Sequence, residues 1–383
     1  MKIVHIFTEY PGNYQPYNKM LIDSQIKSGM QVIIFSTVKV KSNKKYIKFI
    51  PIVDSKLVKI YSFFRYFLNI LKLKTFAHCA WVDAINCISR YKPLLKYRDN
   101  LFHFHHIQMV HGLLLQFLKC FKIKYVLSVR GSDIGVIAKI NTNLKNRFLR
   151  ALNESSGIHA VAIHLKTSLI DLGIDNEKIT VIPRQILQIE NIKHKQNKNI
   201  ELLTVGRIHW IKGYPYILKA LRKFIRHNHA KVHLNICGSG AQKHNENQTW
   251  NDEDYHLRYL INLYNLNDNV TLHGFLEYDE LLHQFNNANI YLCGSLYEGC
   301  NNSLLNALSN ALVVIAPNVG GITDYINNDK NGLLYKTGSA SGLYKCMVKA
   351  IEEKWVPEYN IPPDYPDDIA IINEYRKLYS SLL

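Results

Sequence analysis

The chain has 383 residues, of which 47% are hydrophobic and 20% charged, and this composition excludes a disordered chain, a collagen-like repeat and a disulfide-stapled miniprotein. Its formal net charge of +17 comes from residues 1–195, which hold 30 basic and 11 acidic residues, whereas residues 196–383 hold 17 and 19. Such a basic half predicts a polyanionic partner, either nucleic acid or the anionic inner face of a bacterial membrane. A lysine-rich genome with solvated lysines is the simpler alternative, but it would affect both halves alike.

The first residues, the longest uncharged run and the cysteines indicate the cellular compartment of the chain. Residues 1–7 lack the basic, long apolar and small-residue segments of a secretion signal, so export is not expected. The longest uncharged run, Leu101–Leu118, contains four histidines and is too polar to span a bilayer. The seven cysteines are scattered without a Cys-x-x-Cys pair, which excludes a disulfide framework and a zinc knuckle. We therefore expect a cytoplasmic chain with reduced thiols.

The first half alternates short apolar strands with helical stretches, a pattern typical of a parallel sheet covered on both faces. A helix over Tyr17–Ser28 is expected to end at Gly29. The expected strands are Ile3–Phe7, Gln31–Ser36, Leu101–His105, Tyr125–Val129, Ile158–Val161 and Ile179–Pro183.

A polar stretch of low complexity predicts a linker over residues 191–199, after which the alternation restarts. The expected strands of the second half are Glu201–Val205, Val232–Cys237, Val270–His273, Ile290–Cys293, Val313–Ala316 and Leu333–Tyr335. One helix is expected to begin at Tyr214. The other expected helices cover Tyr255–Asn265, Asp279–Asn287, Asn302–Asn310, Ala340–Glu353 and, after a Pro-rich break, Ile369–Leu382. The pattern predicts an α/β protein with two Rossmann-like domains, 1–190 and 200–362, facing a cleft and binding ligands at the carboxyl ends of their strands.

The segment Leu57–Thr75 mixes aromatic residues with Lys59, Arg65, Lys72 and Lys74. Bulky apolar groups beside cations are typical of a segment that lies in a membrane interface. The basic positions do not gather on one helical face, so an ordinary core helix with snorkelling lysines is the competing interpretation.

The strongest chemical signal is the stretch from Tyr297 to Ala307, where a Gly-containing loop leads from a strand into a helix. Backbone N–H groups at that helix start form an anion site suited to a diphosphate. Glu298 stands at the loop mouth, where its carboxylate can accept hydrogen bonds from sugar hydroxyls. Gly320 and Gly321 would let a second backbone stretch approach the ligand. An ordinary Gly-rich turn with an exposed Glu is the alternative.

A second signal follows the first strand of the second half. Gly206 frees the turn, and Arg207 and Lys212 project from one loop, where two cations can neutralise a leaving nucleoside diphosphate. Gly238 and Gly240 form a Gly-x-Gly loop after the next strand, a weak signal by itself.

Taken in order, these motifs resemble those of GT-B fold glycosyltransferases of family 4, the group 1 transferases. The resemblance is dense over residues 200–336, including the Val270–Phe275 strand with its His-Gly-Phe ending. It is thinner over residues 1–190. There the matching pieces, in the family's order, are Tyr10-Pro11-Gly12, His103-Phe-His105, Arg130-Gly-Ser-Asp133 and Ile179–Pro183.

The resemblance implies a first domain that binds the acceptor, a second that binds the nucleotide sugar, and a helix in residues 363–383 that packs back on the first domain. It implies that Arg207 and Lys212 bind the donor diphosphate and that Glu298 contacts the donor sugar, and it makes these three the catalytic residues. Gly12, His103, His105, Arg130 and Asp133 fall on the acceptor side. The donor would be held around the residues that the motifs share, namely Gly206, Gly238, Gly240, Gly299, Cys300, Asn301, Asn302, Ser303 and Asn306.

Two positions depart from the family pattern. Asn306 stands where the family has a second Glu, usually assigned to the nucleotide ribose, and an amide can still bond a diol without charge. Arg130 stands where the family has a His before Gly-x-Asp. It could hold a phosphate or an acidic sugar, or form a salt bridge with Asp133.

Two further patterns raise the question of a metal. Asp252-Glu-Asp254 spells the Asp-x-Asp metal motif of the other transferase fold, but it lies just before a helix, where acidic residues favour the dipole. Histidines crowd residues 103–111, but His103 and His105 would share one strand face while His106 points away. We prefer one or two of them lining the acceptor cleft, and no metal or other cofactor is expected.

The sequence thus predicts a retaining glycosyltransferase that moves a sugar from a nucleotide-sugar donor to a lipid-linked glycan in bacterial surface-polysaccharide synthesis, such as O-antigen or capsule. The expected partners are the nucleotide sugar, the lipid-linked acceptor and the anionic inner face of the cell membrane. A nucleotide-sugar epimerase of the same fold is the alternative. A basic nucleic-acid-binding protein is a further one, but no RNA- or DNA-binding motif accompanies the charge.

Overall fold

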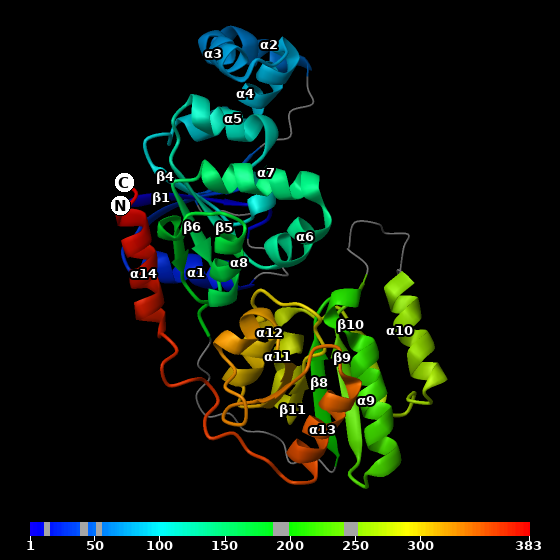
Figure 1. The fold of residues 1–383 in the computed structure, drawn as a ribbon. Coiled ribbons are helices and arrows are strands. Elements are labelled where there is room, and N and C mark those ends of the chain that lie inside the picture. Colours follow the sequence, from blue (N-terminus) through cyan, green and yellow to red (C-terminus); the bar gives the residue numbers. More distant parts are fainter. Residues whose placement is uncertain (11–15, 39–44, 51–55, 187–198, 241–251) are drawn as a thin grey trace. The chain divides into compact units, whose positions relative to one another are not determined.

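The computed structural model describes residues 1–10, 16–38, 45–50, 56–186, 199–240 and 252–383 (Figure 1). The chain divides into two compact units. Unit 1 consists of Met1–Gln185 and Pro366–Leu383, and unit 2 of Ile186–Tyr365. Residues 187–198, which contain most of the expected linker, lie outside the described residues, as does Gly12.

Unit 1 is built on a seven-stranded parallel sheet in the order β3-β2-β1-β4-β5-β6-β7. The order reverses between β1 and β4, so the loops that follow these two strands open side by side at the carboxyl edge of the sheet. The strands are β1 (Lys2–Phe7), β2 (Gln31–Ser36), β3 (Ile47–Phe49), β4 (Leu101–Phe104), β5 (Tyr125–Val129), β6 (Gly157–Ala160) and β7 (Ile179–Val181).

Helices cover both faces of this sheet (Figure 1). They are α1 (Pro16–Lys27), α2 (Lys56–Arg65), α3 (Phe67–Ala77), α4 (Trp81–Leu95), α5 (Gly112–Cys120), α6 (Ala138–Ile140), α7 (Thr142–Asn153), α8 (Ile163–Asp171) and α14 (Asp368–Ser380). A π-helical turn, Asp133–Ile137, and two 3-10 turns, Ile107–Met109 and Asn176–Lys178, complete the unit. Every residue of β4, β5 and β6 is buried, including the polar His103, Ser128 and His159, because helices cover both faces of the sheet.

Unit 2 contains a six-stranded parallel sheet in the order β10-β9-β8-β11-β12-β13, which reverses between β8 and β11. The strands are β8 (Ile200–Val205), β9 (Val232–Cys237), β10 (Val270–Gly274), β11 (Ile290–Leu292), β12 (Val313–Pro317) and β13 (Leu333–Tyr335). The helices are α9 (Tyr214–His227), α10 (Asp252–Leu263), α11 (Tyr278–Asn287), α12 (Asn302–Ser309) and α13 (Ala340–Ile351), with 3-10 turns at Trp210–Lys212 and Gly320–Asp324.

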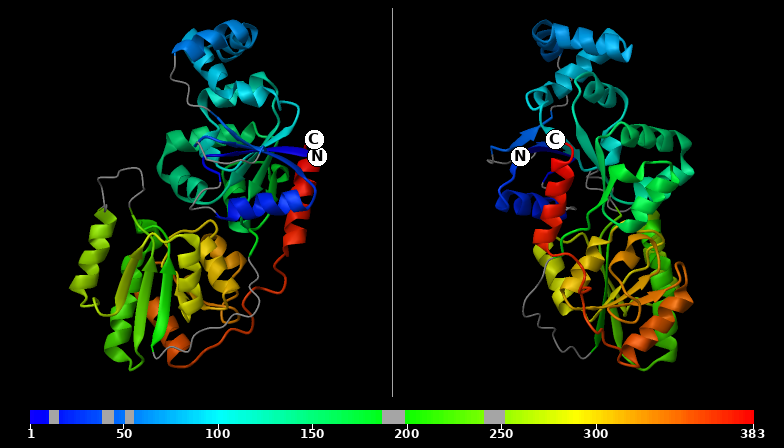
Figure 2. Two further views of the ribbon diagram at one scale, coloured as in Figure 1. Left: turned by 180° about the vertical axis from the view of Figure 1, so that it is seen from behind. Right: turned by 60° about the vertical axis from the view of Figure 1, so that its left-hand side comes forward.

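The carboxyl-terminal helix α14 belongs to unit 1. Asp367 caps its start by accepting a hydrogen bond from the amide of Ala370 at 2.7 Å. Its apolar face, which includes Ile371 and Tyr379, is buried in one cluster with Ile3 of β1 and Leu101 of β4. Both views in Figure 2 show α14 beside α1 and the amino terminus. The last eighteen residues therefore help to build the core of the amino-terminal sheet.

The expected α/β class and the two parallel sheets are confirmed. The sequence patterns missed β3, because it has only three residues, none of them fully buried. They also left the helices between residues 78 and 120 unassigned. Helix α10 begins at Asp252 rather than near Tyr255, with three acidic residues in its first turn.

The segment expected to be either a core helix or an interfacial one forms two helices, α2 and α3. Of α3, only Ile70 and Leu73 are buried, whereas Phe64 at the end of α2 and Leu68 in α3 are 77% and 78% exposed. The core-helix interpretation is therefore wrong for most of this segment. None of the helices in the described residues is both long and apolar enough to cross a bilayer.

Candidate functional site

In unit 2, Glu298 and Lys212 meet where the strand order reverses. Lys212 ends the 3-10 turn after β8, and Glu298 lies in the loop between β11 and α12. Lys212 Nζ donates to Glu298 Oε1 at 2.6 Å. Burial lowers the pKa of Lys212, but the charge and hydrogen bond of the Glu298 carboxylate, together with Cys293, raise it, so the net pKa lies above its ordinary value. The two residues form a charged pair at the carboxyl edge of the sheet.

The same carboxylate oxygen is held by two further donors from its own loop. Ser295 Oγ donates to Glu298 Oε1 at 2.7 Å, and Asn301 Nδ2 donates at 3.2 Å. The Glu298 residue is 8% exposed. With three donors on one oxygen, the carboxylate is fixed in orientation before any ligand arrives.

Two glycines allow the loops of this site to approach one another. Gly213 adopts a left-handed conformation with φ +62°, and a Cβ there would overlap the carbonyl oxygen of Gly294 in the β11 loop. Gly320, with φ +56°, lies against the Glu298 carbonyl, which accepts a hydrogen bond from the amide of Gly321 at 3.0 Å. The backbones thus touch directly on both sides of Glu298, which a larger residue at either glycine would prevent.

Helix α12 starts at Asn302, four residues after Glu298. Asn301 caps it by accepting from the amide of Leu304 at 3.1 Å, while its own amide donates to Tyr325 Oη at 2.8 Å. Asn302 and Ser303 occupy the first turn, where amides have no acceptor within the helix. The sequence prediction of an anion-binding helix start is therefore compatible with the geometry.

The remaining predicted donor-side residues differ in burial and in the contacts that they make. Arg207 is exposed in the loop that follows β8, and Gly206 accepts a hydrogen bond from Tyr214 Oη at 2.6 Å through its carbonyl oxygen. The amide of Gly240 donates to Asp254 Oδ1 at 3.2 Å, which gives that carboxylate a role within the loop. Gly238 packs on the Gly206 carbonyl, Gly299 is buried, Cys300 is half-buried, and Asn306 lines a small hollow against α11.

In unit 1, His103 does not line an acceptor surface. It is 0% exposed, and its ring nitrogens bond Tyr379 Oη of α14 and Ser128 Oγ of β5, both at 2.7 Å. Ser128 in turn bonds His159 Nδ1 at 2.8 Å. The prediction for His103 is wrong because the interior of this sheet contains a continuous polar layer. The side chains of this polar layer come from several strands, so the sequence of any single strand does not indicate it.

His105 lies beside this layer, and its ring stacks on that of His103 with centroids 4.2 Å apart. Three nitrogens, one each from His5, His103 and His105, lie within 4.8 Å of one another. His5 Nδ1 and His105 Nε2 share a hydrogen bond of 2.9 Å, and both nitrogens of His103 are engaged. Burial lowers the pKa of His5 to about 3 and those of the other two well below their ordinary value. The three rings are therefore uncharged at neutral pH, and a metal bound by all three would have to replace a hydrogen bond of His103.

Arg130 and Asp133 follow β5 but have separate roles. Asp133 Oδ1 accepts from the amides of Gly131 and Ile134, each at 3.0 Å, so it shapes the turn. Arg130 instead extends towards α1, where it donates to Asn18 Oδ1 at 2.9 Å and to Tyr17 Oη at 3.2 Å. Among the described residues, no ion pair joins the two side chains.

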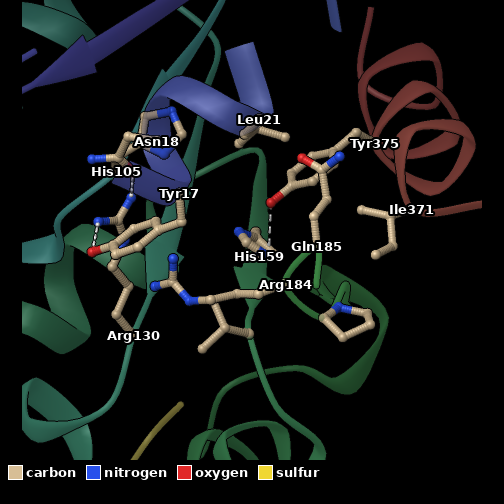
Figure 3. Close-up of a pocket in the computed structure, with 12 residues that line it drawn as sticks. Tyr17, Asn18, Leu21, His105, Arg130, His159, Arg184, Gln185, Ile371 and Tyr375 are labelled. Atoms are coloured by element: carbon tan, nitrogen blue, oxygen red, sulfur yellow. Dashed lines mark hydrogen bonds between the residues drawn. The ribbon is translucent and has the colours of Figure 1, made fainter. Parts of the chain in front are cut away.

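Arg130, His105 and His159 line a pocket in unit 1 with residues that the sequence analysis did not select, including Tyr17 and Arg184 (Figure 3). Arg184 follows Pro183 at the end of β7. A basic residue directly after a strand was the signal that could have found it.

Comparison with known proteins identifies the carboxyl-terminal unit. Residues 186–361 match the family described as glycosyl transferases group 1. This part of the chain belongs to that family. The Glu298 and Lys212 pair therefore lies in a glycosyltransferase domain, as the motifs of residues 200–336 indicated.

Relatives and solved structures extend the comparison. The uncharacterized glycosyltransferase MJ1607 of Methanocaldococcus jannaschii is 24% identical over 232 residues, a match that covers 55% of this chain and 56% of the relative. Anabaena HepE, solved with UDP and glucose, is 14% identical, and the match covers the whole of both chains with a TM-score of 0.74. The lipopolysaccharide outer core galactosyltransferase WaaB matches equally completely, at 14% identity and a TM-score of 0.67. The structural matches show that the complete chain has the GT-B glycosyltransferase fold.

Proposed function

We propose that this protein is a retaining glycosyltransferase that moves a sugar from a nucleotide-sugar donor to a glycan acceptor. The observation that carries the proposal is the Lys212 and Glu298 pair, joined at 2.6 Å beside the first turn of α12. An ammonium group and helix-start amides favour a diphosphate. A carboxylate held on one oxygen leaves its second oxygen for a sugar hydroxyl.

In the proposed reaction, the bond between the anomeric carbon and the diphosphate oxygen breaks, and a bond from the acceptor oxygen to that carbon forms on the same face of the sugar, which retains the configuration. The nucleoside diphosphate leaves with the bonding electrons, and one of its oxygens takes the proton that the acceptor hydroxyl loses. Arg207 and Lys212 stabilise the negative charge that develops on the diphosphate. Because two cations and the α12 amides supply this stabilisation, the proposal includes no metal ion.

The first prediction concerns the donor. A thermal-shift screen against UDP-, GDP- and ADP-sugars should raise the melting temperature with at least one of them, because a ligand that binds only the folded state stabilises it. The complex of HepE with UDP and glucose makes UDP-sugars the first to try. The shift should persist in EDTA. A screen with no shift for any nucleotide sugar would overturn the proposed donor class, and conversion of a lone nucleotide sugar into its epimer would favour the epimerase alternative.

We further propose that the acceptor is a lipid-linked glycan of surface-polysaccharide synthesis, met at the anionic inner face of the membrane. Helices α2 and α3 support this, since they lie at the end of unit 1 away from its sheet (Figure 1). Phe64 of α2 and Leu68 of α3 are largely exposed. Residues 56–77 contain five basic and no acidic residues. Lys74 Nζ lies 5.2 Å from the centroid of the Trp81 ring, so cations and apolar groups share one surface. Such a surface suits an anionic lipid interface. The WaaB comparison supports the polysaccharide role.

The second prediction tests this surface by vesicle flotation. The wild-type protein should bind phosphatidylglycerol vesicles better than phosphatidylcholine vesicles at low salt. Replacing Phe64 and Leu68 together by Ser should weaken binding about tenfold or more. Each substitution removes the favourable free energy of transferring an apolar side chain from water into the membrane interface. Ile140→Ser, at a position 78% exposed on α6, is the matched control and should bind as the wild type does. Equal binding of the wild type to both vesicle types would contradict the proposal.

A further inference from the structure

A second and larger pocket of unit 1 lies at the carboxyl edge of its sheet, where the strand order reverses between β1 and β4. Its lining includes Thr8 after β1, Thr37 after β2 and His106 after β4, together with Arg90 and Leu94 of α4. Doubly wound sheets bind their ligands at such a reversal. The free volume is about 570 Å³, within the range of about 300 to 1,000 Å³ typical of small-molecule sites. The pocket therefore has both the place and the room for a ligand.

Helix α4 forms one wall of this pocket and is held by its neighbours. Arg90, Tyr91 and Leu94 line the pocket. Lys92 Nζ of the same helix donates to Ser62 Oγ of α2 at 3.1 Å, and α4 packs on α2, α3 and α5. The wall is thus anchored before a ligand arrives, which reduces the entropy lost on binding.

Two side chains of opposite charge line the pocket, Arg90 and Glu9. In the described part of the chain, neither forms an ion pair or a side-chain hydrogen bond. The Nε atom of Arg90 is buried and has no hydrogen-bond partner. A buried donor without a partner lowers stability, and a ligand oxygen beside it would remove that cost.

The two histidines of the lining carry no charge at pH 7. Burial, followed by Arg130 and Arg184, lowers the pKa of His106 to about 3. Burial, followed by Arg147, also lowers the pKa of His111. Among the described lining residues, the guanidinium group and the carboxylate are then the only charges, and they sum to zero.

We infer that this pocket binds a neutral sugar of the acceptor glycan, with Arg90 donating to its hydroxyl groups and Glu9 accepting from them. A sugar hydroxyl both donates and accepts, so it suits both side chains. Leu94, Phe104 and Met109 supply apolar lining for the C–H face of the ring. An acidic sugar would share the pocket with Glu9, and an amino sugar with Arg90, and like charges this close are unfavourable. The assignment to the acceptor rests on the proposed function, in which unit 2 holds the donor.

The third prediction tests this pocket by saturation-transfer NMR on the full-length protein. The neutral probes are the methyl glycosides of glucose, galactose, mannose and N-acetylglucosamine, and glucuronate and glucosamine are the charged counterparts. At least one neutral glycoside should bind, and more tightly than either charged sugar. Arg90→Gln and Glu9→Ala should each weaken this binding about tenfold, because each removes hydrogen bonds to a charged group. Thr8→Trp, at an exposed position of the lining, should block it.

Two control variants make the result specific. Arg98→Gln, at an exposed position just beyond α4, should bind the glycoside as the wild type does. Glu298→Gln should also retain this binding, which separates the pocket from the proposed donor-sugar contact in unit 2.

The outcomes separate this inference from the proposed function. If no neutral glycoside binds the wild type, or if either Arg90→Gln or Thr8→Trp binds it with unchanged affinity, the inference is overturned even when nucleotide sugars bind normally. Tighter binding of glucuronate or glucosamine would overturn the neutral class of sugar. If no nucleotide sugar binds but glycoside binding depends on Arg90, the sugar pocket stands, and its assignment to an acceptor falls with the proposed function.

Discussion

Replacing Lys212 with alanine is expected to lower kcat/KM for sugar transfer by about 10²-fold or more. Loss of one preorganised group that stabilises developing charge has effects of this size in other enzymes. A 10²-fold loss corresponds to about 2.7 kcal/mol of transition-state stabilisation. Lys212 has two functions here, since it supplies a cation for the diphosphate and holds Glu298 Oε1 at 2.6 Å.

The same substitution should also reduce stability, because Glu298 is buried and loses its ionic partner. Ser295 and Asn301 still donate to the carboxylate, so we expect a loss of about 1 to 3 kcal/mol in the free energy of unfolding rather than the larger cost of an isolated buried charge. Chemical denaturation measures this loss, and steady-state kinetics below the new melting temperature measure the catalytic one. Lys349→Ala, which removes a largely exposed ion pair with Asp329 in the same unit, is the control and should change neither quantity appreciably.

Arg207→Ala separates the two functions of Lys212. Arg207 is exposed in the loop that follows β8, so its removal should leave the free energy of unfolding nearly unchanged while transfer falls by about 10²-fold. A wild-type rate for this variant would remove Arg207 from the diphosphate site and leave Lys212 as the assigned cation. A wild-type rate for Lys212→Ala would refute the pair as the centre of the reaction.

Twelve of the thirteen strands, all except β3, could be predicted from the sequence because they are short apolar segments. Val313–Ala316, for example, contains no polar residue and is too short for an ordinary helix. Helix α9 could be predicted because its apolar residues recur at helical spacing. In the structure these residues are buried. Helices α4 and α5 were not assigned. In the structure they pack on each other and on α3, a contact between helices that the sequence pattern did not indicate.

The candidate site of unit 2 could be predicted because its residues belong to continuous motifs in two loops. The motif predicted that Glu298 and Lys212 serve one ligand, but not that they bond to each other. That contact depends on the close approach of Gly213 to the β11 loop, which joins segments about 80 residues apart. The pocket of unit 1 was missed for the same reason, since Tyr17, Arg130 and Arg184 lie far apart in the sequence and converge only in the sheet.

Glu298→Gln should lower kcat by about 10²-fold while nucleotide affinity changes much less. The amide keeps the shape of the side chain, and its oxygen can still accept from Lys212 and Ser295, so the loops and the diphosphate site should persist. The substitution removes the negative charge that would bind the hydroxyls of the donor sugar and oppose positive charge at the anomeric carbon as the bond to the diphosphate breaks. Turnover kinetics together with calorimetric titration of the nucleoside diphosphate would measure the two effects separately.

Glu201→Gln is the matched control. Glu201 also accepts a side-chain hydrogen bond, from Asn235 Nδ2 at 2.8 Å, but it lies near the amino end of β8. A loss of nucleotide affinity equal to the loss of turnover would place Glu298 in donor binding alone, and an unchanged turnover would exclude its contact with the transferred sugar.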